Sequence, residues 1–176
     1  MGSDVTIRRA RPADLVVVAP LIGAFRDALR RLDPDDRAIE RGLARVLADR
    51  AVTVGLAMAG CQAVGYTLQR RHFSVWAQGE EALLEDLFVA AAARGRQVGR
   101  RLAEHAIAEA RAAGCRAISL DTNERNEAAN AIYRRLGFCC ERWRWDGGRQ
   151  IRYDLKLEPL AQAEAGIHWG PWMVRW

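Results

Sequence analysis

Lysine is almost missing from this chain: of its 27 basic residues, Lys156 is the one lysine and the others are arginine. No apolar run is long enough to cross a membrane, and residues 1–9 are polar and basic, without the apolar core of a secretory signal. No run of like charge is long enough to serve as a nucleic-acid-binding arm. These absences lead us to expect a soluble cytoplasmic protein that binds neither membrane nor nucleic acid.

Cysteine is scarce as well, and its spacing excludes a common use. Cys61, Cys115, Cys139 and Cys140 show no CxxC pattern and have no histidine nearby, so we expect no zinc or other metal site. In the cytoplasm these thiols would be reduced. Half of the 176 residues are hydrophobic, which excludes a disordered chain and suits one domain with a real core. The net charge of +5 is compatible with an anionic ligand.

Apolar spacing and turn residues predict one mixed α/β (α+β) domain, with a central sheet of about seven strands and about four helices. The expected strands are 5–10, 52–59, 63–70, 82–89 and 117–121, followed by closing strands at 138–145 and 150–157 around a turn at 146–148. The expected helices are 14–31, then one with Asp33 as N-cap and Pro34 at its first position that runs to about Asp49, then 98–113 ended by Gly114, and Asn126–Leu136 ended by Gly137. Residues 60–62 read as a tight turn and residues 70–81 as less regular.

The stretch RGRQVGRRL, residues 94–102, places four arginines and two glycines directly ahead of a helix. The first N–H groups of a helix have no intrahelical partner and the helix dipole is positive there, so a glycine-containing loop can direct several N–H groups at one anion. A diphosphate would suit such a loop; the alternative is a solvated basic loop with an ordinary glycine turn. No GK[ST] follows, which excludes a Walker A loop, and the spacing is not GxGxxG.

Two motifs in the right order resemble the GNAT superfamily of N-acetyltransferases. Residues 89–102 resemble its acyl-CoA-binding pattern [Q/R]-x-x-G-x-[G/A], with Arg94 first, Gly99 last and Gln97 where a glycine is usual. Asn126, Ala129, Tyr133, Gly137 and Phe138 resemble the later element N-x-x-A-x-x-x-Y-x-x-x-G-F. The resemblance covers about residues 5–157 and implies a single GNAT-like domain.

The resemblance implies an acetyl-CoA-dependent N-acetyltransferase that moves an acetyl group to a primary amine by direct attack. Tyr133 would protonate the coenzyme A thiolate, and a phenol is protonated at neutral pH; its alternative role is that of a core aromatic. The backbone of Leu87 or Val89 would pair with the cofactor and supply the oxyanion donor. Asn126 would contact the cofactor, cap its helix, or do both. The full set expected to bind the cofactor is Leu87, Phe88, Val89, Arg94, Gly95, Arg96, Gln97, Val98, Gly99, Arg100, Asn126, Ala129 and Tyr133.

Glu85 and Asp86 are the expected base and amine-binding groups, because a buried acid can hold a cationic amine and accept its proton. Adjacent strand residues point to opposite faces, so one of the two would face the cleft. Glu85 shares parity with Leu87 and Val89, and we expect it to be the catalytic carboxylate that faces the cleft; a bulge would exchange the assignment. The alternative is an ion pair with an arginine at the strand edge.

The acceptor is less well defined by the sequence. Phe73, Ser74 and Trp76, followed by LEDLFV at 84–89, resemble diamine acetyltransferases, which favours a small cationic amine and gives Trp76 a role in substrate binding. LDTN at 120–123 resembles general small-substrate or protein N-acetyltransferases, and aminoglycosides are a further possibility. A non-catalytic acyl-CoA-binding domain is another class. The alternation in ERWRW at 141–145 is better explained by a strand than by a nucleic-acid surface.

Residues 158–176 form a tryptophan-rich extension beyond the domain at 1–157. GIHWGPWMVRW, residues 166–176, carries more apolar surface than a monomer usually exposes. We expect it to pack over the acceptor cleft or against a second subunit of a homodimer. His168 would then reach a substrate, or simply lie at the surface.

Overall fold

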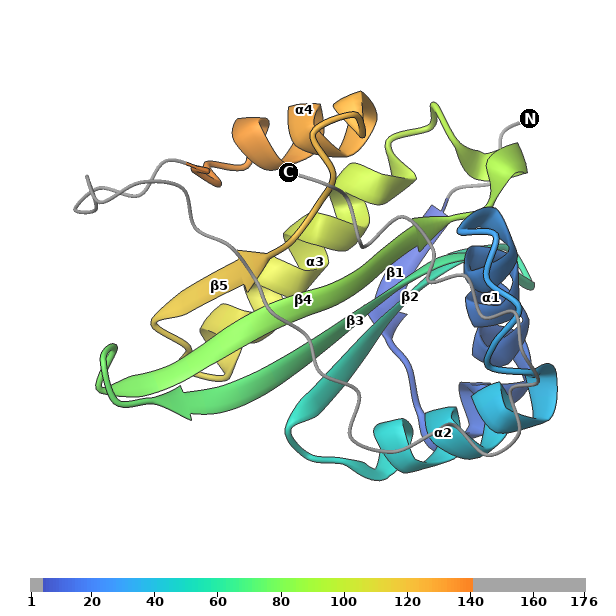
Figure 1. Ribbon diagram of the computed structural model, residues 1–176, viewed down its shortest axis with the longest axis horizontal. Helices are drawn as coiled ribbons and strands as arrows, with labels where there is room; N and C mark the ends of the chain where they lie inside the picture. Colours follow the sequence, from blue (N-terminus) through green and yellow to red (C-terminus); the bar gives the residue numbers. More distant parts are fainter. Residues whose placement is uncertain (1–4, 141–176) are drawn as a thin grey trace.

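The computed structural model describes residues 5–140, which build a five-stranded mixed sheet with helices on both faces (Figure 1). The strands lie side by side in sequence order; β1 to β4 are antiparallel neighbours and β5 runs parallel to β4. The strands are β1 (Val5–Arg9), β2 (Val52–Ala59), β3 (Gln62–Ser74), β4 (Gly79–Val89) and β5 (Ala117–Leu120). The helices are α1 (Leu15–Ala28), α2 (Asp36–Ala48), α3 (Val98–Ala112) and α4 (Glu127–Arg135), with short 3-10 helices at Pro12–Asp14 and Ala91–Ala93.

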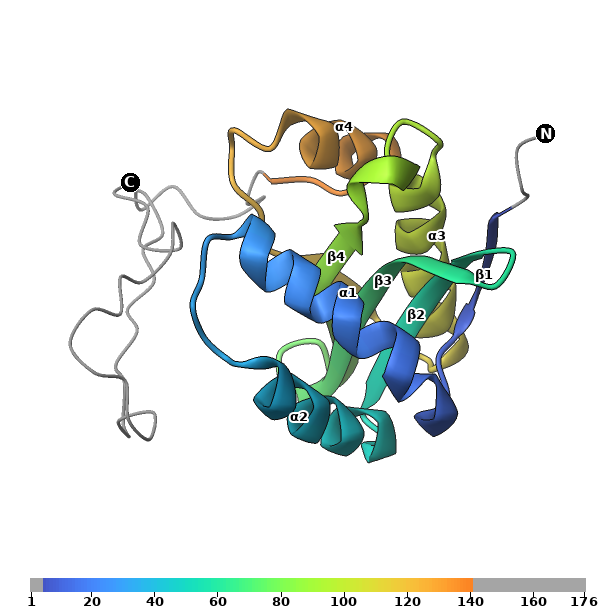
Figure 2. The ribbon, with the colours of Figure 1, turned by 90° about the vertical axis from the view of Figure 1, so that its right-hand side faces the viewer.

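Two separate cores lie on the two faces of the sheet, because α1 and α2 cover one face and α3 and α4 the other (Figure 2). The α1/α2 face is filled by side chains such as Val18 and Leu43 against Leu56, Tyr66 and Phe88. The opposite face is filled by α3 and α4 residues against side chains of all five strands. Successive strand residues alternate between these two cores, which is the pattern expected of a sheet covered on both sides.

The helix ends predicted from Gly114 and Gly137 are confirmed for α3 and α4. Gly114 and Gly137 both have positive φ, of 76° and 88°, and each lies one residue beyond the helix cap. Asn126 is the N-cap of α4, and its side-chain oxygen accepts a hydrogen bond from the N–H of Ala129 at 3.3 Å. The strand at 52–59 and the tight turn after it are confirmed as well, with Gly60 at φ 62°.

The predicted start of the second helix is wrong by two residues. The N-cap of α2 is Asp35, whose carboxylate accepts from the N–H of Ala38 at 2.7 Å, and not Asp33. Pro34 therefore precedes the helix instead of opening it. The linker is held from α1, because Arg26 donates to the Pro34 carbonyl and to the Asp36 carboxylate, both at 2.8 Å. That pair of contacts selects the later aspartate as the cap.

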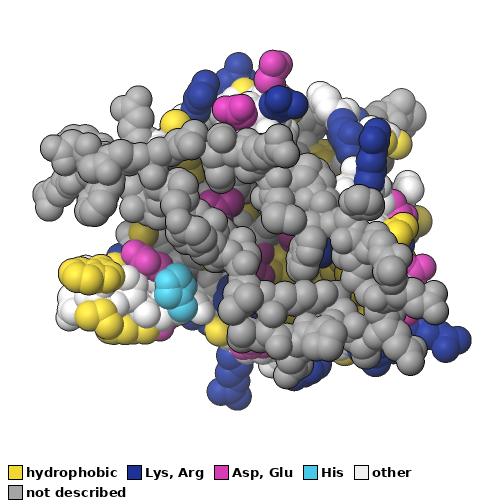
Figure 3. Space-filling model, in the orientation of Figure 1, with side chains coloured by type: hydrophobic (Ala, Val, Ile, Leu, Met, Phe, Trp, Pro, Cys, Tyr) yellow, Lys and Arg dark blue, Asp and Glu magenta, His cyan; other side chains and the backbone are white. Residues whose placement is uncertain are grey.

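Residues 70–81, predicted to be less regular, instead form a two-stranded arm. Strand β3 continues to Ser74 and β4 begins at Gly79, although β2 pairs with β3 only as far as Arg70 and β5 meets β4 only from Glu81. Hydrophobic side chains gather beside a histidine at the free end of this arm (Figure 3). There Phe73, Val75 and Trp76 are 63%, 69% and 98% exposed. Polar residues at most positions hide the strand pattern from the sequence.

The sheet has fewer strands in the described part of the chain than the seven or so predicted. The five strands lie between residues 5 and 120, and residues 138–140 are not in a strand. The rest of the two predicted closing strands, and the extension at 158–176, lie outside the described residues.

Candidate active site

The sheet opens between β4 and β5 halfway along β4. The pairing of the two strands ends at Leu84 and Leu120, whereas β4 stays paired with β3 as far as Val89. The N–H of Ala90 donates to the carbonyl of Val64, toward β3. Because backbone groups alternate sides along a strand, Leu87 and Val89 direct theirs to the open edge. These are the two residues whose backbone the resemblance assigns to the cofactor.

The loop from β4 to α3 leads from that edge into a helix whose first N–H groups have no intrahelical acceptor. Gly95 and Gln97 both have positive φ, of 74° and 60°, and Gln97 is the N-cap of α3. The first turn of the helix closes with the Arg101 N–H donating to the Gln97 carbonyl at 3.0 Å. The N–H groups of Val98, Gly99 and Arg100 therefore have no acceptor within the helix. Gln97 adopts the left-handed conformation, which costs less for the glycine that usually stands at this position of the family pattern.

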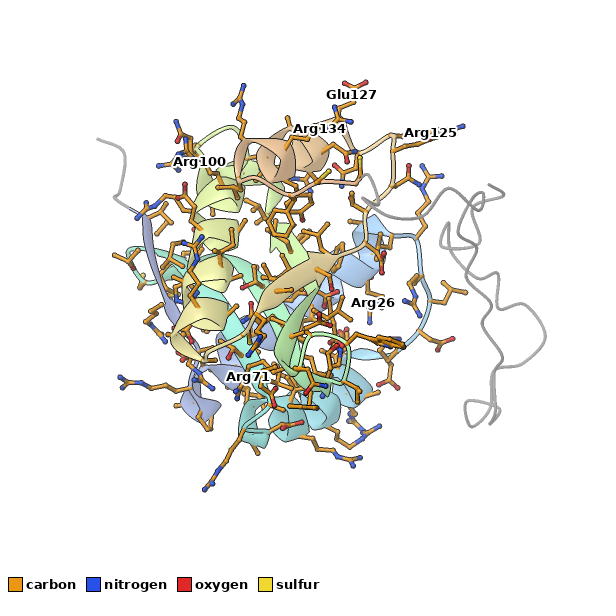
Figure 4. All side chains as sticks on the ribbon, turned by 90° about the vertical axis from the view of Figure 1, so that its left-hand side faces the viewer. Arg26, Arg71, Arg100, Arg125, Glu127 and Arg134 are labelled. Carbon is orange, nitrogen blue, oxygen red and sulfur yellow. The ribbon has the colours of Figure 1, made fainter. Side chains whose placement is uncertain are left out.

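The arginines of this loop hold the local structure as well as adding charge. The Nε of Arg94 donates to the Val89 carbonyl at 3.1 Å, which ties the loop to the open edge of β4. Arg100 forms an ion pair with Glu104 one turn further along α3, at 2.8 Å. Figure 4 shows Arg100 of α3 and Arg134 of α4 at the same end of the molecule. This end is therefore rich in both positive charge and helix N–H groups, a combination that suits phosphate.

Tyr133 packs against the same region from α4. Its side chain is 9% exposed and belongs to a cluster with Leu84 and Ala106, against which Leu87 packs. The ring also meets Phe138 edge-on, with centroids 5.6 Å apart. Burial raises the pKa of the phenol, so it remains a proton donor at neutral pH. The structure thus brings Tyr133 to the neighbourhood of the β4 edge, and its part in the reaction stays a prediction.

A β-bulge separates the two acids of β4 in a way that parity did not predict. Gln69 is opposite Leu84 and Leu68 is opposite Asp86, so no residue of β3 lies opposite Glu85 in the strand register. The prediction that Glu85 lies on the same face of β4 as Leu87 and Val89 is therefore wrong. Glu85 instead lies in an ion pair with Arg70 at 3.2 Å, the alternative considered for it. A second acid, Asp49, meets the same arginine at 3.3 Å.

Asp86 is the acid that faces the α1/α2 core. It lies opposite Leu68 of β3 and accepts a hydrogen bond from the Tyr66 hydroxyl at 3.1 Å. Burial raises the pKa of its carboxyl; the Tyr66 hydrogen bond lowers the pKa, the charge of Glu85 raises it and that of Arg31 lowers it. A part-buried carboxylate next to the opening in the sheet is well suited to hold a cationic amine.

Tyr66 was not among the predicted site residues. In the sequence it reads as one more apolar position of β3, and only the bulge brings Asp86 to its hydroxyl. The available signal was that a buried tyrosine hydroxyl usually needs a partner.

Trp76, predicted to bind the substrate, is not brought together with these residues. It lies at the tip of the arm, 98% exposed, where β3 and β4 have left the rest of the sheet. The arm carries it away because the β3–β4 ladder continues where an irregular loop was expected. In the part of the chain that the structure describes, no group of three His, Cys, Asp or Glu side chains could hold a metal ion. No helix in that part is long and apolar enough to span a membrane.

Known proteins with similar sequences carry acetyltransferase names. Residues 57–138 match the model of the Acetyltransferase (GNAT) family. The chain is 34% identical over 168 residues to the aminoglycoside N(6')-acetyltransferase type 1 of Stenotrophomonas maltophilia, and the alignment covers 92% of this chain and 99% of that protein. It is 28% identical over 134 residues to the uncharacterized N-acetyltransferase YhfO of Bacillus subtilis (strain 168), covering 76% and 89%.

Solved structures share the fold. The crystal structure of a probable acetyltransferase aligns with a TM-score of 0.74 at 22% identity, over 86% of this chain and 99% of that one. An aminoglycoside acetyltransferase from an uncultured soil metagenomic sample, in complex with trehalose, aligns with a TM-score of 0.71 at 19% identity, over 86% and 97%. At these identities the likeness concerns the fold alone.

The chain belongs to the GNAT family and is an N-acetyltransferase. Membership of this family implies acetyl-CoA as the acyl donor. The short resemblance to diamine acetyltransferases stays a prediction.

Proposed function

We propose that this enzyme acetylates a primary amine of a small polycationic acceptor, with aminoglycosides as the first class to test. The observation that carries the proposal is the part-buried Asp86 at the point where β4 and β5 separate, since it offers a negative charge beside the expected acetyl-donor site. The near full-length similarity to an aminoglycoside acetyltransferase supports the same class of acceptor.

The residues at the opening fit acetyl-CoA. The open edge of β4 offers backbone groups of Leu87 and Val89, and the first turn of α3 offers the N–H groups of Val98, Gly99 and Arg100 to a diphosphate. A Cβ added at position 99 would make ordinary van der Waals contacts of 3.4 to 3.7 Å with Ile132, Val89 and Leu87, so the first turn of α3 packs against both α4 and the end of β4. When bound, acetyl-CoA supplies an activated acetyl thioester.

The roles proposed for the chain's own residues follow from their surroundings. Asp86 binds the acceptor as an ammonium ion and accepts its proton, which frees the lone pair of the amine. The N–H of Leu87 or Val89 donates to the oxygen that becomes negative during attack. Tyr133 protonates the departing sulfur, since its raised pKa keeps the phenol protonated. Asn126 contributes by holding the start of α4.

The test is thiol release from acetyl-CoA with a panel of aminoglycosides, polyamines, amino acids and peptides with free N-termini. We expect turnover with aminoglycosides or another small polycation, greatly reduced in the Tyr133→Phe variant. Turnover with peptides alone would favour the protein N-acetyltransferase alternative. Tight acetyl-CoA binding without turnover on any amine would favour the non-catalytic acyl-CoA-binding alternative and count against the proposal.

A further inference from the structure

Tyr66 is fully buried, and its hydroxyl is held in one place. Its ring packs against both Phe25 and Phe88, with centroid distances of 6.4 and 6.3 Å, and those two rings are 5.4 Å from each other, so the three rings form a triangle. The hydroxyl donates to the Oδ2 of Asp86 at 3.1 Å. Because the ring cannot turn away from this aromatic cluster without disturbing the α1 contact, the hydroxyl fixes the carboxylate in position.

The β4 bulge is what makes this contact possible. Leu84 packs in the α3/α4 core, and in a regular strand residue 86 would follow it to that face. The extra residue, Glu85, reverses the alternation, so that Asp86 and Phe88 both meet the α1/α2 face, where Tyr66 lies. The same bulge lies next to the last paired residues of β4 and β5. The carboxylate is thus set at the sheet opening by two features, the bulge and the tyrosine.

Within residues 5–140, three polar groups act on Asp86 from the elements around it: Tyr66 of β3, Glu85 of β4 and Arg31, just after α1. The Tyr66 hydrogen bond and the Arg31 charge oppose burial and the Glu85 charge, and so lower the pKa of the Asp86 carboxyl. Burial and Asp86 raise the pKa of Tyr66 itself far above its ordinary value, so this hydroxyl stays a donor throughout the working range of pH.

We propose that Tyr66 is a positioning residue for the acetyl transfer: it holds one oxygen of Asp86, favours the ionised carboxylate, and leaves the second oxygen for the acceptor ammonium. This inference rests on the function proposed above, in which Asp86 receives the amine. Tyr66 is fully buried in β3, so it acts on the reaction through Asp86.

The experiment is the pH dependence of kcat/KM for wild type and Tyr66→Phe, which removes the hydroxyl and keeps the ring. Without the donated hydrogen bond the Asp86 carboxyl holds its proton to higher pH, so the acid limb should move up by about one pH unit. The ratio of the wild-type kcat/KM to that of Tyr66→Phe should therefore grow as the pH falls. Phe25→Leu is the matched control: it loosens the same aromatic cluster without touching the hydrogen bond, and should lower stability while leaving the acid limb in place.

A second measurement does not depend on activity. In protein labelled with ¹³C at aspartate carboxyls, the Asp86 signal is identified by its absence in Asp86→Asn, and its titration is followed by NMR. It should titrate at higher pH in Tyr66→Phe than in wild type or Phe25→Leu. An unchanged titration would overturn the inference. A changed titration with an unmoved acid limb would overturn the role of the pair in the reaction, whereas a wild-type enzyme that acetylates no cationic amine refutes the proposed function instead.

Arg31→Gln separates the two influences that lower the pKa of Asp86. Arg31 acts through charge alone, so its effect should fade as salt is added, whereas the effect of the Tyr66 hydroxyl should persist. If the Tyr66→Phe shift disappears in high salt as the Arg31→Gln shift does, the hydroxyl does not hold the carboxylate and the inference is wrong.

Discussion

Replacing Gln97 with glycine is expected to stabilise the protein. Gln97 has φ 60° and ψ 10°, and its side chain makes no capping hydrogen bond. The left-handed conformation costs a residue with a side chain roughly 1–2 kcal/mol, whereas the added freedom of glycine in the unfolded chain costs roughly 0.5–1 kcal/mol. The difference is a gain of about 0.5–1 kcal/mol, or a Tm higher by about 1–4 °C for a chain of this size.

Two control variants isolate the cause. Gln97→Ala shortens the side chain but keeps the strained backbone, so its stability should stay within about 0.5 kcal/mol of wild type. Gly95→Ala should have the opposite effect to Gln97→Gly, a loss of about 0.5–1 kcal/mol, because Gly95 has φ 74° and no atom within 4 Å of an added Cβ. Urea unfolding and calorimetry measure all three. A Gln97→Gly variant no more stable than Gln97→Ala would refute the reasoning.

Three further predictions concern stability. Asp35→Ala should lose about 0.5–2 kcal/mol in urea unfolding, because Asp35 caps α2, whereas Asp33→Ala should lose clearly less; equal losses would contradict the observed cap. The hydrogen bonds of the Arg8 side chain, with help from the Arg11 N–H, lower the pKa of Asp14 to about 2, below its value near 4 in the unfolded chain. These contacts therefore contribute stability above pH 4 that is lost as the pH falls toward 2. Asp14→Asn should therefore destabilise at pH 7 but not at pH 2, and a loss that is the same at both would refute the linkage. Gln69 is 1% exposed and neither of its amide atoms bonds to a described residue, so Gln69→Met should gain about 1 kcal/mol in thermal unfolding; a loss would mean that the amide is satisfied.

Local signals predicted much of the fold correctly. Gly114 and Gly137 mark the ends of α3 and α4 because glycine adopts positive φ easily. Asn126 marks the start of α4 because its side chain can accept a hydrogen bond from the first turn. The start of α2 was predicted wrongly because three aspartates near Pro34 offer equivalent caps, and a contact from Arg26 on another helix makes the choice.

The candidate site depended more on long-range pairing. The loop before α3 was recognised from its glycines and arginines, and the structure adds that Gly95 and Gln97 have positive φ. The bulge at Glu85 has no signature in the sequence, since it depends on how β4 registers with β3. Once the register is known, the ion pair of Glu85 with Arg70, the hydrogen bond of Tyr66 to Asp86 and the place of Trp76 at the tip of the arm all follow. Parity counted along one strand could not supply them.

The most direct test of this account compares Asp86→Asn with Glu85→Gln in steady-state acetylation of the best amine found in the panel. Both changes remove one negative charge from neighbouring residues, and far-UV circular dichroism checks that both proteins are folded. Asp86→Asn should lower kcat/KM roughly a hundredfold or more, as expected for loss of a general base. Glu85→Gln should lower it less than about fivefold, because it loses only a part-exposed ion pair with Arg70. The reverse order, with Glu85 essential and Asp86 dispensable, would contradict the site described for this enzyme.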